Sequence, residues 1–450
     1  MTENSSADVI VIGLGPGGET VAARLLEAGL DVVGIERELV GGECPYWGCI
    51  PSKMMVRAAG ALQEGRRVPL LAGAAEVRPD FAPVARRIRA EATDDWDDAV
   101  AVARFEKAGG RFLRGSAAIE APGRIRVGDE TVQARRGVVV ATGSSPVRPR
   151  IPGLAEAGYW TNREAIAATS APDSLVVLGG GAIGLELAQA FARFGAAVAV
   201  VEGADRILPN EEPEASELAE RVLTAEGISV HAGRRATTVH RDADRHVTLE
   251  DGTQVSGAEL LVSVGRRPST RGLGLEHYGI EGPAVPVDPA MRAAEGLWAI
   301  GDVTGLGGFT HLSVHHASIA AADILGEPTP DRHAVVPRVT FTDPEIGSVG
   351  FTEAAARAAG LRVLVGTADA AMTSRGFTHG PGNAGLIKLV VDADRDLLVG
   401  ATSAGPSGGE VLGLLALVVH AHVPVAALRS MIFAYPTFHR GVLDALAALS

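Results

Sequence analysis

The chain has 450 residues, of which 46% are apolar and 21% charged, a globular composition that excludes a long disordered polar chain. The formal net charge is −13 and no run of lysine and arginine stands out, so we expect no nucleic-acid partner. Only two cysteines are present, which excludes a disulfide-rich scaffold for a chain of this length.

Neither a targeting segment nor a membrane span is expected. The first residues, MTENSSADVIVIG, lack a basic region and a cleavable apolar core. The uncharged stretch 411–428 is interrupted by two histidines and a proline, which favours a buried helix followed by a turn. We therefore expect a cytoplasmic protein without a membrane partner.

The first structural signal is a β-branched run at 8–13, followed by a glycine loop at 13–18, a helical stretch at 19–28 and a second strand at 31–36. This order of strand, glycine loop, helix, strand and acid is the dinucleotide-binding fingerprint. It recurs in a strand at 175–178, a loop at 179–184, a helix to Phe194 and a strand at 197–202. In both copies the acid follows the first glycine by 23 positions, which predicts two dinucleotide sites.

Each position of the fingerprint has a physical role. The first glycine permits a tight turn, the second lets the backbone approach a pyrophosphate, and the third allows close packing of helix on strand. The phosphates then face the helix N-terminus, where free N–H groups favour anions. The predicted residues are Gly13, Gly15, Gly18 and Glu36 in the first copy, and Gly179, Gly181, Gly184 and Glu202 in the second.

The acids bear on the choice of nucleotide. Glu36 and Glu202 are expected to accept hydrogen bonds from ribose hydroxyls, and at the second site a carboxylate also repels a 2′-phosphate. No basic residue replaces Glu202, although Arg206 lies nearby. The pattern favours NADH over NADPH.

The remaining segments indicate an α/β fold with two Rossmann-like dinucleotide-binding domains and an α+β C-terminal domain. The chain crosses between domains at the proline-rich segment 145–152 and returns near 260–268. The further predicted strands are 137–143, 297–302, 336–344 and 385–392, and the predicted C-terminal helices are 410–420 and 442–449. The predicted domains are 1–150 with 265–332, then 151–264, and then 333–450.

The two cysteines lie in the most informative segment, GGECPYWGCIPSK at 41–53. Cys44 and Cys49 can close a small disulfide loop. Pro51 suits the first turn of a helix, which would place Cys49 at the helix N-terminus with Lys53 one turn later, and both features favour a thiolate. A redox-active pair is the favoured interpretation, with a structural disulfide and a metal site as alternatives.

In its motifs the chain resembles the flavoprotein pyridine nucleotide–disulfide oxidoreductases, the family of dihydrolipoamide dehydrogenase, glutathione reductase and mercuric reductase. The resemblance covers almost the whole chain, and the motifs occur in the family's order. They are 13–18, Gly42-x-Cys44-x4-Cys49-Ile-Pro-Ser-Lys53, Ala141-Thr-Gly143, 179–184, Gly265-Arg-Arg-Pro268, Ala299-Ile-Gly-Asp302 and 337–345.

The resemblance implies FAD in the first site, a nicotinamide dinucleotide in the second, and a homodimer formed through the C-terminal domain. It implies that Cys49 is the thiol nearer the flavin, that Cys44 attacks the acceptor, and that Lys53 lies near flavin N5 paired with Glu186. Glu186 on a solvated helix face is the alternative. The further residues implied for FAD are Gly42, Lys53, Ala117, Thr142, Gly143, Asp302 (at the ribityl chain) and His311, and for NAD Gly265.

One motif departs from the family. Its acid–base motif is His-Pro-Thr-x-x-Glu, and here Tyr435 stands in place of the histidine and Arg440 in place of the glutamate. A histidine with an ordinary pKa of about 6.5 shuttles protons at neutral pH, whereas a tyrosine at about 10 is a poor general base. The departure therefore puts lipoamide and glutathione in question as acceptors, and His439 is either a substitute proton carrier or an ordinary polar residue.

Two further groups have open interpretations. Pro45, Tyr46 and Trp47 either shape an acceptor pocket or pack against the loop. His311, His315 and His316 are better explained by a helix start and packing than by metal binding, and no metal site is predicted.

The leading functional hypothesis is a flavoprotein disulfide reductase that passes electrons from NADH through FAD to Cys44 and Cys49, and on to an unidentified disulfide-type acceptor. The alternatives are a reductase of quinones, metal ions or other small-molecule electrophiles, and a flavin-binding redox sensor with little turnover.

Overall fold

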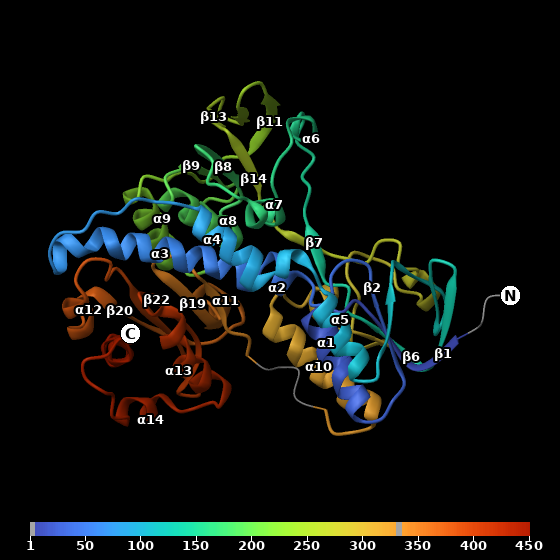
Figure 1. Ribbon diagram of the computed structural model, residues 1–450. Helices are drawn as coiled ribbons and strands as arrows, with labels where there is room; N and C mark the ends of the chain where they lie inside the picture. Colours follow the sequence, from blue (N-terminus) through green and yellow to red (C-terminus); the bar gives the residue numbers. More distant parts are fainter. Residues whose placement is uncertain (1–4, 330–334) are drawn as a thin grey trace. The chain divides into compact units, whose positions relative to one another are not determined.

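The computed structural model describes residues 5–329 and 335–450, and its contacts divide the chain into two compact units (Figure 1). The first unit consists of the described residues of Met1–Pro51, Arg87–Val147 and Gly265–His333. The second consists of those of Ser52–Arg86, Arg148–Val264 and Ala334–Ser450.

The first unit is built on an eight-stranded sheet whose main path runs β16-β17-β6-β1-β2-β3. Its strands are β1 (Ser5–Ile12), β2 (Val32–Glu36), β3 (Arg111–Arg114), β4 (Ala117–Ala121), β5 (Arg124–Val127), β6 (Glu130–Val140), β16 (Arg292–Ala294) and β17 (Leu297–Ala299). Its helices are α1 (Pro16–Glu27), α2 (Glu43–Trp47), α5 (Ala99–Lys107) and α10 (Thr310–Leu325), with a short π-helix at Ile88–Ala92 and 3-10 turns at Asp94–Trp96, Leu275–Tyr278 and Gly301–Thr304.

Strand β1 is the centre of this sheet because both of its faces are buried. It pairs in parallel with β2 and β6, and Val9 lies opposite both Val32 and Gly137. Val9 and Val11 face a core formed with α1 and α10, which lie side by side in Figure 1, whereas Ile10 and Ile12 face a core that includes β4 and β5. A continuous apolar run is what a parallel strand covered on both faces requires.

The predicted strand, loop, helix and strand of the first copy are confirmed, with one correction. The helix begins at Pro16 and not at Glu19. Proline has a fixed φ and no N–H group, so it suits the first turn of a helix.

The second unit contains a parallel four-stranded sheet of order β10-β9-β8-β14 and an antiparallel three-stranded sheet of order β11-β12-β13. These strands are β8 (Ser174–Leu178), β9 (Ala197–Val201), β10 (Ser229–His231), β11 (Ala236–Arg241), β12 (Arg245–Leu249), β13 (Gln254–Gly257) and β14 (Glu259–Val262). Its helices before residue 330 are most of α3 (Cys49–Leu71), then α4 (Ala82–Arg87), α6 (Leu154–Ala157), α7 (Asn162–Ala167), α8 (Ala182–Arg193) and α9 (Pro213–Ala225). The second fingerprint copy is confirmed as β8, α8 and β9.

The C-terminal part of this unit is an antiparallel sheet of order β18-β19-β22-β21-β20, against which α13 packs. Its elements are β18 (Arg338–Thr340), β19 (Glu345–Gly350), α11 (Glu353–Ala358), β20 (Val363–Asp369), α12 (Ser374–His379), β21 (Leu386–Asp392), β22 (Leu397–Gly405), α13 (Gly408–His420), α14 (Val425–Ser430) and α15 (Gly441–Ala447), with 3-10 turns at Ala370–Met372 and Phe438–Arg440. The strand predicted at 336–344 is shorter, since Pro337 and Pro344 lack the N–H that a ladder needs. Within the described residues, no helix combines the length and the apolar character needed to span a bilayer.

Two short strands lie where the chain leaves and re-enters the first unit. They are β7 (Ser144–Pro146) and β15 (Arg266–Pro268), which pair antiparallel. The predicted three-domain division stays a prediction, and its boundary at 332/333 lies outside the described residues.

A buried lysine ties β21 to α9 and α11. Lys388 is 2% exposed, and its Nζ lies 3.0 Å from Glu212, 2.8 Å from Glu214 and 3.0 Å from Glu353. Burial alone would lower the pKa of Lys388, but the hydrogen bonds to these carboxylates outweigh it and raise that pKa. The Lys388 hydrogen bond lowers the pKa of Glu353 in turn.

We predict that Lys388→Met lowers the free energy of unfolding by about 3 kcal/mol, because it leaves the buried Glu212 carboxylate without its cation. The midpoint of urea unfolding measures this, and Lys107→Met at an exposed position should change it by less than about 0.5 kcal/mol. Because the Lys388 hydrogen bond lowers the pKa of Glu353 in the folded protein, this carboxylate stabilises the fold at pH values above its ordinary pKa, and that stabilisation is lost as the pH falls. The difference in unfolding free energy between Lys388→Met and the parent should therefore shrink below about pH 4. An equal difference at pH 3 and pH 7 would contradict the stabilising role given to these ion pairs.

Candidate active site

The first glycine loop joins β1 to α1 and is tightly packed at three of its four glycines. Gly13 has φ +94°, and a Cβ there would lie 2.5 Å from the carbonyl oxygen of Ala141. At Gly18 a Cβ would lie 1.9 Å from the carbonyl oxygen of Gly13. At Gly15 the nearest atom would be the Gly42 Cα, at 3.9 Å. The loop is open only at its second glycine, where a pyrophosphate would approach the backbone.

The second loop, between β8 and α8, repeats this geometry. Gly179 has φ +109°, and a Cβ there would lie 2.5 Å from the carbonyl oxygen of Ser263. At Gly184 a Cβ would lie 2.2 Å from the carbonyl oxygen of Gly179, and at Gly181 it would meet nothing within 4 Å. Both loops therefore have the shape that a dinucleotide requires.

The two acids are also held in the same way. Oε2 of Glu36 accepts a hydrogen bond from the N–H of Leu14 at 2.9 Å, and Oε1 accepts one from Glu38 at 2.9 Å. Glu202 accepts the two equivalent hydrogen bonds, from the N–H of Gly180 at 2.6 Å and from the N–H of Ala204 at 2.7 Å. Each acid therefore connects the end of its strand to its own glycine loop.

Arg206, the basic residue near Glu202, is already occupied. Its guanidinium donates hydrogen bonds to the carbonyl oxygens of Leu208, Pro209 and Glu211, at 2.9, 2.9 and 2.7 Å. In this arrangement it is not available to bind a 2′-phosphate.

The cysteine segment lies in two consecutive helices of the chain. Cys49 begins α3, as predicted, whereas the short helix α2 that contains Cys44 was not predicted; both cysteines are half-buried. A Cβ on Gly48 would lie 3.2 Å from the Glu43 carbonyl oxygen and 3.9 Å from the Cys44 Cα, so the chain before Cys49 folds back onto the start of α2. The Cys49 Sγ lies 3.3 Å from the Oγ1 of Thr310, a residue that the sequence reasoning missed.

The aromatic residues of this segment pack against the chain. Tyr46 is buried, and Trp47 stacks on Trp96 with ring centroids 5.2 Å apart and an angle of 19°. Trp96 also donates a hydrogen bond from Nε1 to the Tyr46 carbonyl oxygen at 3.3 Å. Asp94, Asp95 and Trp96 all have positive φ, so this packing is held by a strained segment. No sequence signal marked Trp96, because its partner lies 49 positions away.

Polar residues of the predicted FAD site connect the crossing strands to the sheet. Thr142 donates a hydrogen bond to the Ser269 carbonyl oxygen at 2.9 Å. Asp302, in the 3-10 turn after β17, accepts one from the Ser144 hydroxyl at 2.6 Å, and Ser144 accepts another from Arg266. The carboxylate that the resemblance assigns to the ribityl chain is therefore held in a defined position.

Two glycines with predicted roles lie beside the crossing strands. Gly143 has φ +65° and accepts a hydrogen bond from the N–H of Ser269, and Gly265 has φ +118° and accepts one from Val147. Gly265, assigned to NAD by the resemblance, belongs to the first unit, whereas Gly179 and the rest of its loop belong to the second.

The predicted residues on α10 and β4 have different surroundings. His311 is exposed and stacks on Phe309 at 5.3 Å. His316 is 1% exposed and accepts a hydrogen bond from the N–H of Gly301, as expected of a packing residue. Ala117 is partly buried against the sheet core.

An ion pair between a half-buried lysine and a buried glutamate joins α3 to α8 within the second unit. The Lys53 Nζ lies 2.7 Å from Oε2 of Glu186, which is 5% exposed, so the alternative of a solvated face is wrong. The other carboxylate oxygen accepts a hydrogen bond from the Phe341 N–H at 2.9 Å, and the ammonium lies 4.7 Å from the centroid of the Phe341 ring. Both oxygens of Glu186 are used, so the lysine is held in one orientation.

The departing motif near the C-terminus has a physical explanation. Tyr435 is 68% exposed, and its hydroxyl donates a hydrogen bond to Ser374 at 3.0 Å. The Arg440 guanidinium lies 5.6 Å from the centroid of the Tyr435 ring, a cation–π contact. His439 is half-buried in the neighbouring 3-10 turn. Arginine and tyrosine here stabilise each other in place of a histidine and a carboxylate.

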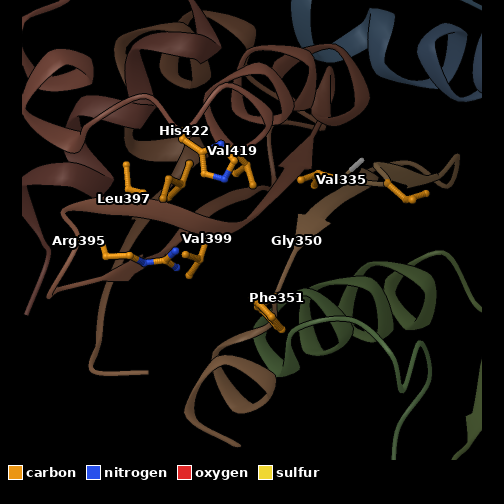
Figure 2. A pocket seen from close by; sticks show the side chains of 10 residues that line it. Val335, Gly350, Phe351, Arg395, Leu397, Val399, Val419 and His422 are labelled. Atoms are coloured by element: carbon orange, nitrogen blue, oxygen red, sulfur yellow. The ribbon is translucent and has the colours of Figure 1, made fainter. Parts of the chain in front are cut away.

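A cavity of about 410 Å³ opens on the C-terminal sheet (Figure 2). Apolar side chains line most of it, among them Phe351, Leu397 and Val399, with Arg395 and His422 as its polar members. None of the predicted site residues lines it.

Comparison with known families agrees with this geometry. Residues 7–322 match the sequence model of the pyridine nucleotide-disulphide oxidoreductases, and residues 336–446 match that of their dimerisation domain.

Individual relatives match over nearly the whole chain. A dihydrolipoyl dehydrogenase of Thermus scotoductus is 35% identical, covering 98% of this chain and 97% of the relative. A mercuric reductase of Shigella flexneri is 32% identical, covering 97% of this chain and 80% of the relative. The solved structure of the HOCl-induced flavoprotein disulfide reductase RclA from Escherichia coli superposes with a TM-score of 0.86 at 27% identity, covering 98% and 99% of the two chains.

The predicted fold class, with its FAD-binding and NAD-binding parts and C-terminal dimerisation domain, is confirmed. The two loop-and-acid cradles, the cysteine pair and these matches together show that the chain belongs to the pyridine nucleotide–disulphide oxidoreductases, as a flavoprotein disulfide oxidoreductase.

Proposed function

We propose that this enzyme transfers electrons from NADH, through FAD bound at the first cradle, to Cys44 and Cys49 and then to a disulfide-type acceptor other than lipoamide or glutathione. The observation that carries the proposal is the recurrence of one cradle geometry in two places, with the cysteine pair in the same unit as the first cradle.

The residues of the first cradle fit FAD. The open space at Gly15 and the start of α1 suit a pyrophosphate, and Glu36 lies at the end of β2 where a ribose would be bound. We assign Asp302, Thr142 and the exposed His311 to the flavin half. When bound, FAD supplies the two-electron link between nicotinamide and the cysteine pair.

The cysteines supply the exchange chemistry. Cys49 begins the 23-residue helix α3, whose dipole favours a thiolate at this end. In the reduced pair, the Cys44 thiolate attacks one sulfur of the acceptor and releases the first thiol. Cys49 then attacks Cys44, which releases the second thiol and restores the Cys44–Cys49 disulfide. Overall, NADH, a proton and R–S–S–R′ give NAD⁺, RSH and R′SH.

Lys53 and Glu186 are assigned as a positioning pair. The carboxylate is buried and has both oxygens bonded, so it holds the partly exposed ammonium in one position. A fixed positive charge there stabilises negative charge that develops on a neighbouring acceptor group.

The preference for NADH is supported by the second cradle. Glu202 presents a carboxylate where a 2′-phosphate would lie, and Arg206 is bound to backbone carbonyls. Arg235, whose side chain packs along Gly203, is the cation that would have to bind the 2′-phosphate of NADPH.

The segment 435–440, which stands in place of the family's acid–base motif, supports a non-standard acceptor. Tyr435 and Arg440 replace the family's acid–base pair, and the exposed tyrosine hydroxyl can donate a hydrogen bond to a bound acceptor in exchange for the one that it makes to Ser374. His439 remains the candidate proton carrier in this segment.

A homodimer is proposed through the segment that matches the dimerisation domain. Large apolar side chains are exposed there, including Ile432 at 95%, Phe377 at 83% and Leu417 at 59%. Burial of such side chains in an interface is favourable. A cytoplasmic location stays a prediction.

Metal-ion reduction is the second candidate, since one relative is a mercuric reductase and RclA has been solved as a Cu(II) complex. The 450 residues hold no cysteines beyond Cys44 and Cys49, so within them only this pair can bind the ion through thiolates.

We predict that anaerobic NADH gives the FAD-loaded protein a long-wavelength absorbance band from the Cys49 thiolate beside the flavin. Cys49→Ser should lose the band, and Cys44→Ser should keep it while losing turnover. Persistence of the band in Cys49→Ser, or a purified protein without flavin, would contradict the proposed electron path.

We predict that kcat/KM for NADH exceeds that for NADPH by at least about tenfold, because a carboxylate faces the 2′-phosphate. Glu202→Ser should lower the ratio of kcat/KM for NADH to kcat/KM for NADPH, mainly by raising kcat/KM for NADPH. Glu217→Ser, at an exposed position of α9, should leave this ratio unchanged. A wild-type preference for NADPH that Arg235→Ala removes would refute the assignment.

We predict slow turnover of lipoamide and glutathione disulfide, since a missing acid–base group costs about 10²–10⁴ in rate. The double variant Tyr435→His, Arg440→Glu should raise lipoamide turnover without changing the rate of flavin reduction by NADH. A panel of disulfides, quinones, Hg²⁺ and Cu²⁺ identifies the acceptor class. Fast wild-type turnover of lipoamide would refute the proposed specificity, and turnover of Hg²⁺ or Cu²⁺ alone would favour the second candidate.

A further inference from the structure

The outer face of the β11-β12-β13 sheet carries two histidines that are direct neighbours across strands. Beyond a register shift between Ala236 and Thr238 the strands alternate, and Val239, Val247 and Val255 face the core of the second unit. The opposite face presents His240 of β11 paired with His246 of β12. Their rings stack with centroids 4.6 Å apart and an angle of 12°.

A carboxylate completes the group. Asp242 follows β11 in the turn to β12, and its Oδ1 lies 2.9 Å from Nε2 of His246. One ligand atom from each of His240, Asp242 and His246 lies within 4.8 Å of the other two. His240 and Asp242 are exposed and His246 is half-buried, so an ion reaches all three from solvent.

The surroundings do not place a competing cation in the group. Arg241 and Arg245 are paired with each other in the register, one position along from the histidine pair, so strand alternation directs them to the other face. Arg245 is ion-paired with Glu259 at 3.0 Å. The next residue of the histidine row, on β13, is the neutral Ser256.

We propose that His240, His246 and Asp242 form a surface binding site for a divalent transition-metal ion of the zinc, nickel and copper type. Two imidazoles and one carboxylate are the donors that these ions prefer, whereas Mg²⁺ and Ca²⁺ prefer oxygen ligands alone. Ligand atoms about 2.1 Å from a tetrahedral ion are about 3.4 Å apart, so small side-chain rotations close the group around it. The antiparallel pairing holds both histidines in register, which lowers the entropic cost of binding.

This site is separate from the proposed electron path. It shares no residue with either cradle or with the cysteine pair, and it binds metal whatever the acceptor is. Its test is therefore a binding measurement and not an activity assay.

The experiment uses the FAD-loaded, full-length protein with its purification tag removed and with Cys44→Ser and Cys49→Ser in every sample, so that no thiolate binds metal. Isothermal titration with Zn²⁺ at neutral pH should show one equivalent bound per chain. His240→Asn and His246→Asn should each weaken binding at least about tenfold, and Asp242→Asn should weaken it less. The matched control is His277→Asn, which removes an exposed histidine outside the proposed site. This variant should bind Zn²⁺ as tightly as the parent does.

Cu²⁺ supplies an independent readout. Its electron paramagnetic resonance spectrum in the parent should show coupling to two nitrogens, and His240→Asn or His246→Asn should reduce this to one. Circular dichroism and flavin content establish that each variant is folded. The proposal is overturned if Zn²⁺ shows no stoichiometric binding, if His246→Asn binds as tightly as the parent, or if His277→Asn loses binding equally.

Discussion

Both nucleotide cradles depend on the same steric constraint, a backbone carbonyl oxygen in the space that a side chain would need. A Cβ on Gly18 would lie 1.9 Å from the Gly13 oxygen, and one on Gly184 would lie 2.2 Å from the Gly179 oxygen. This contact sets how closely α1 and α8 approach the ends of their strands. This close packing places the N-terminus of each helix beside the end of its strand. It leaves the second glycine open and the acid within hydrogen-bonding distance of the loop.

The cradles could be predicted from the sequence because everything that defines them is local. The loop, helix and acid of each copy lie within 23 positions, and the residue types needed at the tight points admit only glycine. The position of Cys49 at the start of α3 was predictable for the same reason, since Pro51 marks the first turn of a helix. Only details of the boundaries, such as the start of α1 at Pro16, differed.

Contacts between distant segments were not predictable in this way. Glu186 lies 133 positions from Lys53, and its own helix gives no sign of which face is buried against α3. The resemblance supplied the pair, but not the hydrogen bond from Phe341 that fixes it. Thr310 beside Cys49 and Trp96 beneath Trp47 were missed outright. The His240–His246 pair required the hairpin register, which no motif in the chain announces.

The two cradles and the segment 435–440 also differ in how much sequence change they tolerate. In the cradles, substitution of Gly18 or Gly184 forces backbone against backbone, so the nucleotide sites tolerate little change. In the segment that departs from the family's motif, Tyr435 is exposed and is held by one hydroxyl contact and the Arg440 guanidinium. Exchanges of exposed side chains usually change stability by less than about 0.5 kcal/mol. The side chains of this segment can therefore change without disturbing the fold of the cradles, and for this reason the family match shows the disulfide-oxidoreductase chemistry but does not specify the acceptor.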